Sequence, residues 1–472
     1  MKACAVLLLL LSSAPAHAQG TRDSARPSDS RPRTVPTPAP AAQPTGQARP
    51  APAATPAPAA TTQRPATTDA TRPGQMQDAP ADTTQQMPAA NPAPAQSPTP
   101  APAAVIVPAL PPVAAAAPLQ PARAVSPGKI RTHREEALRL MRARVSPTAM
   151  PSLTFVTLAV VDPDDSRLHL LTLPKESFLR LGSEMTLASS HGMPLRLRVV
   201  RSNYVNTAVV VSDLAGRQLT PLVVEYPIEK FGRYRETAYY SSAHPALVTP
   251  ELVRQGQAYV RTMVDLAAKR LKDKGFNMTP EVLDMAERLC IVEHVDHERF
   301  RRESRKVLLE EVYALYALNE LDTYRYSVSA AGAGGMVQMI PPTYGFLRRR
   351  YPTVGLNPDF VVGMRNHGNA LEAMLLYIRD TWSDLNQNGD VAGAYATGVA
   401  RRDELIAAGY NSNPARLGSY IRRGGTAWRT LIPRETQMYL QILGAFNSFT
   451  PIKARADKDT AGEVKTAPAA QN

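Results

Sequence analysis

A glutamate followed by a glycine-rich loop is the part of this sequence best suited to chemistry. Glu320 ends a predicted helix, between Leu318 and Leu321, and the loop SAAGAGGMVQMIPPTYG follows at 329–345. Partial burial beside leucines would raise the pKa of the carboxyl, so that it could hold a proton near neutral pH. The glycines would let a ligand lie against bare backbone. The pattern therefore indicates a general acid beside a ligand-binding loop.

A nucleotide is excluded as the ligand of this loop by its neighbours. A Walker loop needs Lys and Ser or Thr directly after its last glycine, and a dinucleotide loop needs a strand before it. Here the last glycine of the cluster, Gly335, is followed by Met336, and a Leu- and Tyr-rich helical segment comes before the loop.

The spacing after Glu320 resembles the first motif of the soluble-lytic-transglycosylase (SLT) family, which reads E-S, then S-x-x-G-A-x-G-L-M-Q-L-M-P-x-T. Two further motifs follow in order: AYATG at 394–398 is similar to A-Y-N-A-G, and IPRETQMYL at 432–440 is similar to L-P-x-E-T-x-x-Y-V. The resemblance covers about 285–450. The matching positions of the first motif are Glu320, Ser329, Gly332, Ala333, Gly335, Met336, Gln338, Ile340, Pro341 and Thr343.

This resemblance implies a lysozyme-like, mostly helical domain that cleaves the β-1,4 bond between N-acetylmuramic acid and N-acetylglucosamine. Glu320 would then be the sole catalytic carboxylate, first protonating the leaving oxygen and then accepting the proton of the muramoyl 6-hydroxyl. The product would carry a 1,6-anhydro end. No cofactor and no metal are implied.

The resemblance also implies substrate-binding roles for four residues. Ser329 would orient Glu320 or the acetamido group of the substrate, and Gln338 would bind sugar. Tyr395 would hydrogen-bond near Glu320, and Tyr439 would line the cleft. The alternatives are structural: Ser329 could only cap a turn, and the tyrosines could only pack.

The sequence departs from the family pattern at three places. Leu321 stands where the family has Ser, and Ala396 stands where it has Asn. A long insertion occupies about 399–430, with arginines that include Arg401, Arg402, Arg416, Arg422 and Arg423. The loss of a polar groove residue at 396 would weaken sugar binding or change the substrate register. The insertion could reshape or cover the groove.

Two metal-site patterns each lack a required ligand. The segment DLNQNGD at 384–390 begins like a calcium loop, but Tyr395 occupies the twelfth position in place of Glu, which predicts a turn at the end of a helix. His297 and Glu298 begin like a zinc-protease motif, but Arg301 replaces its second histidine. A solvated helix face carrying His294 and His297 explains that pattern better.

The N-terminal quarter of the chain predicts export and a tether. Residues 1–18, MKACAVLLLLLSSAPAHA, have a lysine, a short apolar run and a small-residue end, as secretory signal peptides do. Residues 19–127 are rich in Pro, Ala and Thr and have too little apolar surface to fold. We expect a secreted, periplasmic, wall-associated protein with no transmembrane segment.

The net charge of +13 favours an anionic partner. A secreted chain seldom meets nucleic acid, so peptidoglycan glycan strands are the expected partner. Other cell-wall proteins could bind through the β-rich domain or the tether.

The remaining sequence must supply the elements that position these residues. Five segments with alternating apolar residues between 153 and 228 predict a small antiparallel β domain. They are LTFVTLAVVD, RLHLLTL, LRLRVV, TAVVVSD and TPLVVEY. Thr249-Pro250-Glu251 and Thr279-Pro280-Glu281 each predict a helix start, and a third helix is expected from about Arg302 to Asn319. The expected fold is multidomain α+β. Its parts are a signal peptide at 1–18, a disordered linker at 19–127, a β-rich domain with a leading helix at 128–240, a helical connector at 241–284, a lysozyme-like catalytic domain at 285–452 and a disordered tail at 453–472.

Two other functions fit the same residues. In a muramidase of the same fold, water would replace the 6-hydroxyl as the nucleophile. A non-catalytic wall-binding protein would keep the fold without turnover, and Ala396 is the residue that favours it.

Overall fold

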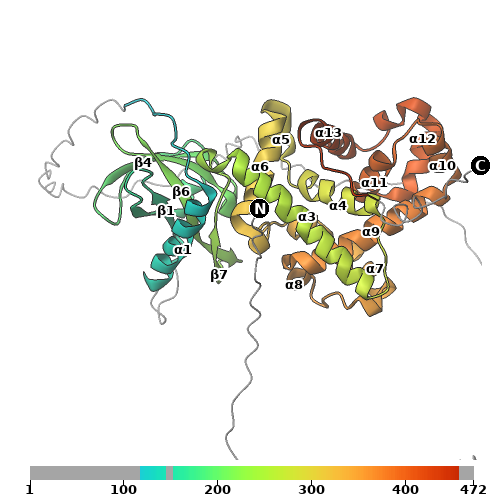
Figure 1. Cartoon of the computed structure of the whole chain (residues 1–472), viewed down its shortest axis with the longest axis horizontal. Helices are drawn as coiled ribbons and strands as arrows, with labels where there is room; N and C mark the ends of the chain where they lie inside the picture. Colours follow the sequence, from blue (N-terminus) through green and yellow to red (C-terminus); the bar gives the residue numbers. More distant parts are fainter. Residues whose placement is uncertain (1–116, 145–151, 457–472) are drawn as a thin grey trace, which may run out of the picture. The chain divides into compact units, whose positions relative to one another are not determined.

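The computed structural model describes residues 117–144 and 152–456. The expected signal peptide, most of the expected linker and most of the expected tail lie outside these residues. Within them, an antiparallel sheet precedes a mostly helical region, so the α+β composition and the order of its parts are confirmed (Figure 1). None of the helices in this part of the chain combines the length and the apolar character that crossing a bilayer requires.

Seven strands form one antiparallel sheet in the order β2-β1-β6-β5-β4-β3, with β7 added to β6. The five strands expected from two-residue alternation are all present. Two more, β3 and β7, were not expected, because β3 buries none of its residues fully and β7 is rich in charged and tyrosine side chains. The strands are β1 (Phe155–Val161), β2 (Leu168–Pro174), β3 (Glu184–Ala188), β4 (Pro194–Arg201), β5 (Ala208–Ser212), β6 (Gln218–Lys230) and β7 (Arg233–Tyr240).

The sheet curls until its two ends approach each other, as in an almost closed barrel. The long strand β6 pairs with β1, β5 and β7, and its register shifts between Ile228 and Glu229. Such bulges bend a strand and increase its twist. Beyond β3, the backbone N–H of Ser190 donates to the carbonyl of Leu170 in β2 at 2.9 Å.

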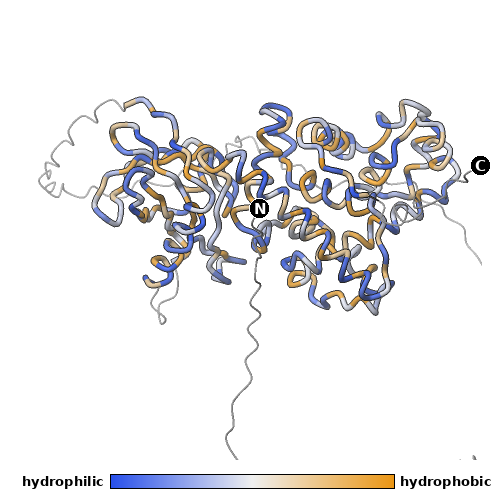
Figure 2. Tube along the Cα trace, viewed as in Figure 1, coloured by the Kyte–Doolittle hydropathy of each residue, from blue (hydrophilic) through white to orange (hydrophobic). Residues whose placement is uncertain are grey.

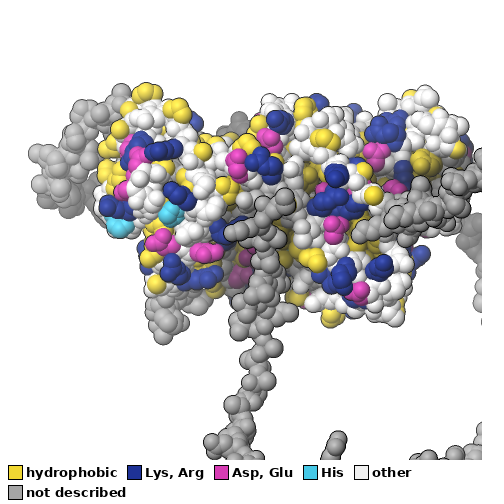
Figure 3. Space-filling view, viewed as in Figure 1, with side chains coloured by type: hydrophobic (Ala, Val, Ile, Leu, Met, Phe, Trp, Pro, Cys, Tyr) yellow, Lys and Arg dark blue, Asp and Glu magenta, His cyan; other side chains and the backbone are white. Residues whose placement is uncertain are grey.

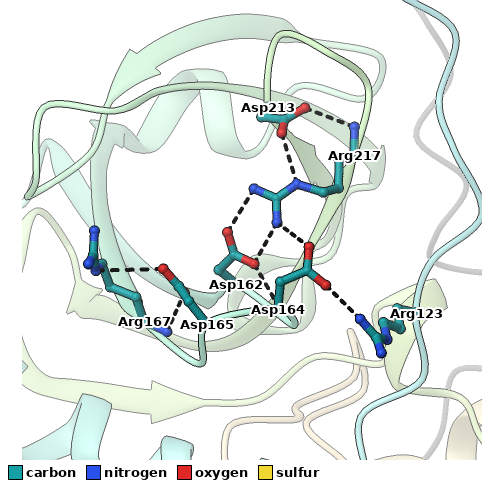
Figure 4. A network of polar contacts seen from close by, with 7 residues as sticks. All are labelled: Arg123, Asp162, Asp164, Asp165, Arg167, Asp213 and Arg217. Carbon is teal, nitrogen blue, oxygen red and sulfur yellow. Dashed lines mark hydrogen bonds and ion pairs between the residues drawn. The ribbon is translucent and has the colours of Figure 1, made fainter.

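An arginine in the turn between β5 and β6 holds two turns of the sheet together (Figure 4). The guanidinium of Arg217 donates to both carboxylate oxygens of Asp162 at 2.7 and 2.8 Å, and also to Asp164 and Asp213. Arg123, which precedes the first helix, donates to the other oxygen of Asp164. The segment before that helix is thereby tied to the sheet.

The helices begin where the capping residues predict. Thr249 caps α3 by accepting from Leu252 N–H, and Gly275, with φ +87°, follows its end. The helices are α1 (Pro127–Arg144), α2 (Lys175–Phe178), α3 (Pro250–Asp273), α4 (Pro280–Val292), α5 (His297–Arg302), α6 (Arg305–Asn319), α7 (Pro341–Arg350), α8 (Phe360–Arg365), α9 (His367–Gln387), α10 (Gly389–Ala396), α11 (Arg402–Asn411), α12 (Leu417–Gly424) and α13 (Arg434–Phe449).

One continuous cluster of buried apolar side chains runs from the sheet into the helices. Hydrophobic and hydrophilic residues follow one another in short runs along the chain trace, in the sheet and in the helices (Figure 2). Helix α9 lies at the centre of the helical part, with Leu371, Met374 and Leu375 fully buried. Helix α3, expected in a connector, packs along α6 and α9 and belongs to the same body.

Helices α5 and α6 join the sheet to the region of the glycine-rich loop. The side-chain amide of Asn319 at the end of α6 both accepts from the N–H and donates to the carbonyl of Ser241. Glu311 of α6 binds Arg201 of β4 and Arg299 of α5, each at 2.7 Å. The loop is therefore connected to a helix that the sheet holds in place.

Candidate active site

The glycine-rich loop folds back on itself twice around Gly334. Gly334 forms isolated antiparallel bridges with Val328 and with Met339. Gly335 has φ +65°, and a Cβ there would lie 2.2 Å from the carbonyl oxygen of Met364 in α8. The expectation that the glycines admit a ligand is thus corrected for this position. Gly335 instead admits the chain's own backbone.

Glu320 ends α6 in a strained conformation and is exposed. Its φ of +49° and ψ of −120° are unusual for a residue with a side chain. The expected partial burial is not observed, since its side chain is 59% exposed and faces Arg131 of α1 at 3.9 Å. The residue lines a pocket of about 120 Å³ together with residues of α1 and α3.

Ser329 and Gln338 both lie in the loop. The hydroxyl of Ser329 accepts from the N–H of Ala333 at 3.0 Å, which is the turn-capping contact. Gln338 has φ +45°, and its amide donates to the carbonyl of Gly335 at 2.8 Å and to the hydroxyl of Ser327 at 3.2 Å. Both side chains support the shape of the loop. Their expected contacts with sugar stay predictions.

Tyr395 lies on α10 and is partly exposed. Its ring packs edge-on against Trp382 of α9, with 5.3 Å between ring centroids. No hydrogen bond joins its hydroxyl to Glu320 within the described part of the chain. Ala396, next to it, is exposed, so an Asn would be accommodated there. The predicted turn at 384–390 is confirmed, because α9 ends at Gln387 and Asn388 caps α10.

The insertion at 399–430 forms α11, α12 and the turns around them. Its apolar side chains, including Leu417 and the fully buried Trp428, make a small core with α9 and α10. Arg422 binds Asp390 at 2.7 Å, and Arg429 binds Glu404. Basic side chains on the face drawn in Figure 3 lie at many separate positions rather than in one patch.

Tyr439 of α13 contacts a different glutamate, Glu293. The Tyr439 hydroxyl donates to Oε1 of Glu293 at 2.5 Å. Glu293 caps the C-terminus of α4, and burial raises its pKa to about 8, with the Tyr439 hydrogen bond acting in the opposite direction. The negative end of the helix dipole also disfavours a carboxylate at this position. The structure thus provides a carboxyl group that holds its proton at neutral pH.

The residue after Glu293 contacts the glycine-rich loop. His294 Nε2 lies 3.0 Å from the carbonyl oxygen of Met336. The prediction of a solvated helix face carrying His294 and His297 is wrong, because α4 ends before His294 and a separate helix, α5, begins at His297. Glu293, Tyr439 and the loop are therefore neighbours.

Glu293 is not predicted from the sequence, because the motif spacing connects the loop to the glutamate that precedes it without interruption, which is Glu320. The signal that selected Glu320, a glutamate ending an apolar helix, also exists in LCIVE at 289–293. Helices α5 and α6 separate this second glutamate from the loop in sequence but not in space.

No protein-family model, no curated protein and no solved structure matches the chain.

Proposed function

We propose that this protein is a peptidoglycan lytic transglycosylase in which Glu293 is the single acid and base. The observation that carries the proposal is the hydrogen bond from Tyr439, in the third motif, to Glu293, beside the loop of the first motif. The resemblance in sequence supplies the substrate class. The contact supplies the carboxyl that would act on it.

The proposed reaction uses one carboxyl twice. Protonated Glu293 gives its proton to the glycosidic oxygen, and the bond from that oxygen to the muramoyl anomeric carbon breaks. The muramoyl 6-hydroxyl then bonds to the same carbon, and its proton passes to the Glu293 carboxylate. The carboxyl is regenerated, and the products are a 1,6-anhydro end and a free 4-hydroxyl.

Other residues keep the roles that the resemblance implies. Ser329, Gln338 and Tyr395 would bind the glycan strand, and Tyr439 would orient Glu293 rather than Glu320. A lysozyme-like arrangement of the helical part, export to the periplasm and attachment to the cell wall belong to the same proposal.

The test compares two matched variants on isolated sacculi. Glu293→Gln keeps the size of the side chain but neither donates nor accepts the proton, so turnover should fall by about 10²- to 10⁴-fold with glycan binding kept. Glu320→Gln, at an exposed position, should keep turnover within about threefold of wild type. The reverse result would return the catalytic role to Glu320.

Mass analysis of the wild-type products identifies the reaction. Anhydro ends are about 18 mass units lighter than reducing ends because they lack one water. Reducing ends would indicate a muramidase. Binding without any cleavage would indicate a wall-binding protein.

A further inference from the structure

Two side chains beside Glu293 hold consecutive carbonyl groups of the glycine-rich loop. His294 Nε2 contacts the oxygen of Met336 at 3.0 Å, and the Tyr410 hydroxyl donates to the oxygen of Val337 at 2.7 Å. His294 directly follows Glu293 in the chain, and Tyr410 comes from α11. The loop is therefore held by the residue that follows Glu293 in the chain and by a tyrosine close enough for the Glu293 charge to act on it.

The His294 ring is fixed on its face as well as at its edge. It stacks flat on Tyr324, with 3.4 Å between centroids and 4° between planes. Tyr324 is buried, has φ +57° and packs edge-on against Tyr316 of α6. Burial lowers the pKa of His294 to about 3, so the ring is neutral at physiological pH. Because a carbonyl oxygen can only accept, the hydrogen of the neutral ring resides on Nε2.

We propose that His294 is a positioning residue, a neutral N–H donor that fixes the glycine-rich loop at a set distance from the Glu293 carboxyl. The proposal rests on the proposed function of Glu293. With the ring stacked and the carbonyl bound, the Met336 end of the loop cannot move away from the end of α4. A displacement of about 1 Å between a catalytic group and its substrate can lower a rate by about 10²-fold.

Loss of this contact would also change the surroundings of Glu293. The groups around its carboxyl are Tyr439 and Glu435 from α13, Tyr410 from α11 and Cys290 from α4. A loosened loop would admit water, weaken the effect of burial and lower the pKa of Glu293. The position of the loop is thus measurable through the titration of the carboxyl.

The experiment uses two variants of the full chain. His294→Phe keeps the stacking on Tyr324 and removes the donor, whereas His294→Gln keeps an N–H donor at similar reach. For His294→Phe we expect kcat on glycan strands to fall by about 10- to 100-fold, with KM changed less than about threefold. The alkaline limb of the pH profile should move to lower pH. In His294→Gln, kcat should be at least tenfold higher than in His294→Phe. The alkaline limb of its pH profile should lie at the wild-type pH.

A second readout does not need turnover. Carbon NMR titration of the Glu293 carboxyl, assigned by its absence in Glu293→Gln, should give a lower pKa in His294→Phe than in wild type or His294→Gln. Equal carboxyl titrations in folded wild type and His294→Phe would overturn the positioning role. So would a folded His294→Gln as impaired as His294→Phe. If His294→Phe does not fold, the positioning role requires that the Glu293 carboxyl titrates with the same pKa in His294→Gln as in wild type. Failure of the proposed function would show separately, as active Glu293→Gln or as wild-type products without anhydro ends.

Discussion

The Tyr439 hydroxyl donates a 2.5 Å hydrogen bond to Glu293 across 146 positions of sequence. Tyr439 is 2% exposed, so the contact is made inside the helical core, between the end of α4 and the middle of α13. It joins the third motif to a carboxyl that lies outside the contiguous first motif.

The pH dependence of cleavage should report the titration of Glu293. Its pKa, raised by burial to about 8, means that the acid is protonated below pH 8, so kcat/KM should fall tenfold per unit above about pH 8. Tyr439→Phe removes a hydrogen bond that favours the carboxylate, so the limb should move to higher pH. The control is Tyr234→Phe in β7. An unshifted limb in Tyr439→Phe would argue against Glu293 as the acid.

Stability should depend on pH through the same group. Between about pH 4.5 and 8 the native state keeps a proton on Glu293 that the unfolded chain releases. The contribution of Glu293 to the free energy of unfolding is therefore complete below pH 4.5 and is lost as the pH rises through 8. Urea unfolding of wild type and Glu293→Gln at about pH 5 and 9 should show the wild type losing stability relative to the variant. If the two proteins differ in free energy of unfolding by the same amount at both pH values, the raised pKa of Glu293 is contradicted.

Two adjacent glycines of the loop should respond differently to alanine. Residue 335 has a positive φ, and in Gly335→Ala the new Cβ would lie 2.2 Å from the carbonyl oxygen of Met364. This variant should therefore lose more than about 1 kcal/mol of stability and all cleavage activity. Residue 334 has a negative φ, and in Gly334→Ala the new Cβ would lie 3.6 Å from its nearest neighbour, the Cβ of Met364. That variant should stay close to wild type. Denaturant midpoints and sacculus assays measure both effects, and equal behaviour of the pair would exclude the close approach of α8.

Removal of Arg455 should destabilise the helix that carries Glu293. Arg455 is buried and binds Asp284 and Glu287 of α4, each at 2.7 Å. Arg455→Ala would leave the buried Asp284 without its cation and Glu287 with Arg261 alone, at a cost of about 3–5 kcal/mol in unfolding free energy. Arg422→Ala removes an exposed, solvent-screened ion pair with Asp390 and should leave the free energy of unfolding almost unchanged. Denaturant titration distinguishes the two, and equal losses would contradict the anchoring role.

The sequence by itself determined the local elements. Thr249 and Thr279 before Pro mark two helix starts, and two-residue alternation marks five of the seven strands. These signals act within a few residues, through cap geometry and the pleat of a strand. The strands β3 and β7 also alternate in burial, but β3 has only five residues, none of them fully buried, and β7 is rich in charged and tyrosine side chains. Their pairing with β4 and β6 defines them.

The tertiary structure alone decided which glutamate meets Tyr439. Glu320 and Glu293 both end apolar helices, and nothing within a few residues of either one distinguishes them. Burial of a carboxyl, and therefore its pKa, depends on neighbours that arrive from α11 and α13, more than 100 positions away. Long-range packing placed Glu293 among them and left Glu320 exposed, because desolvation is a property of the folded core and not of the adjacent residues.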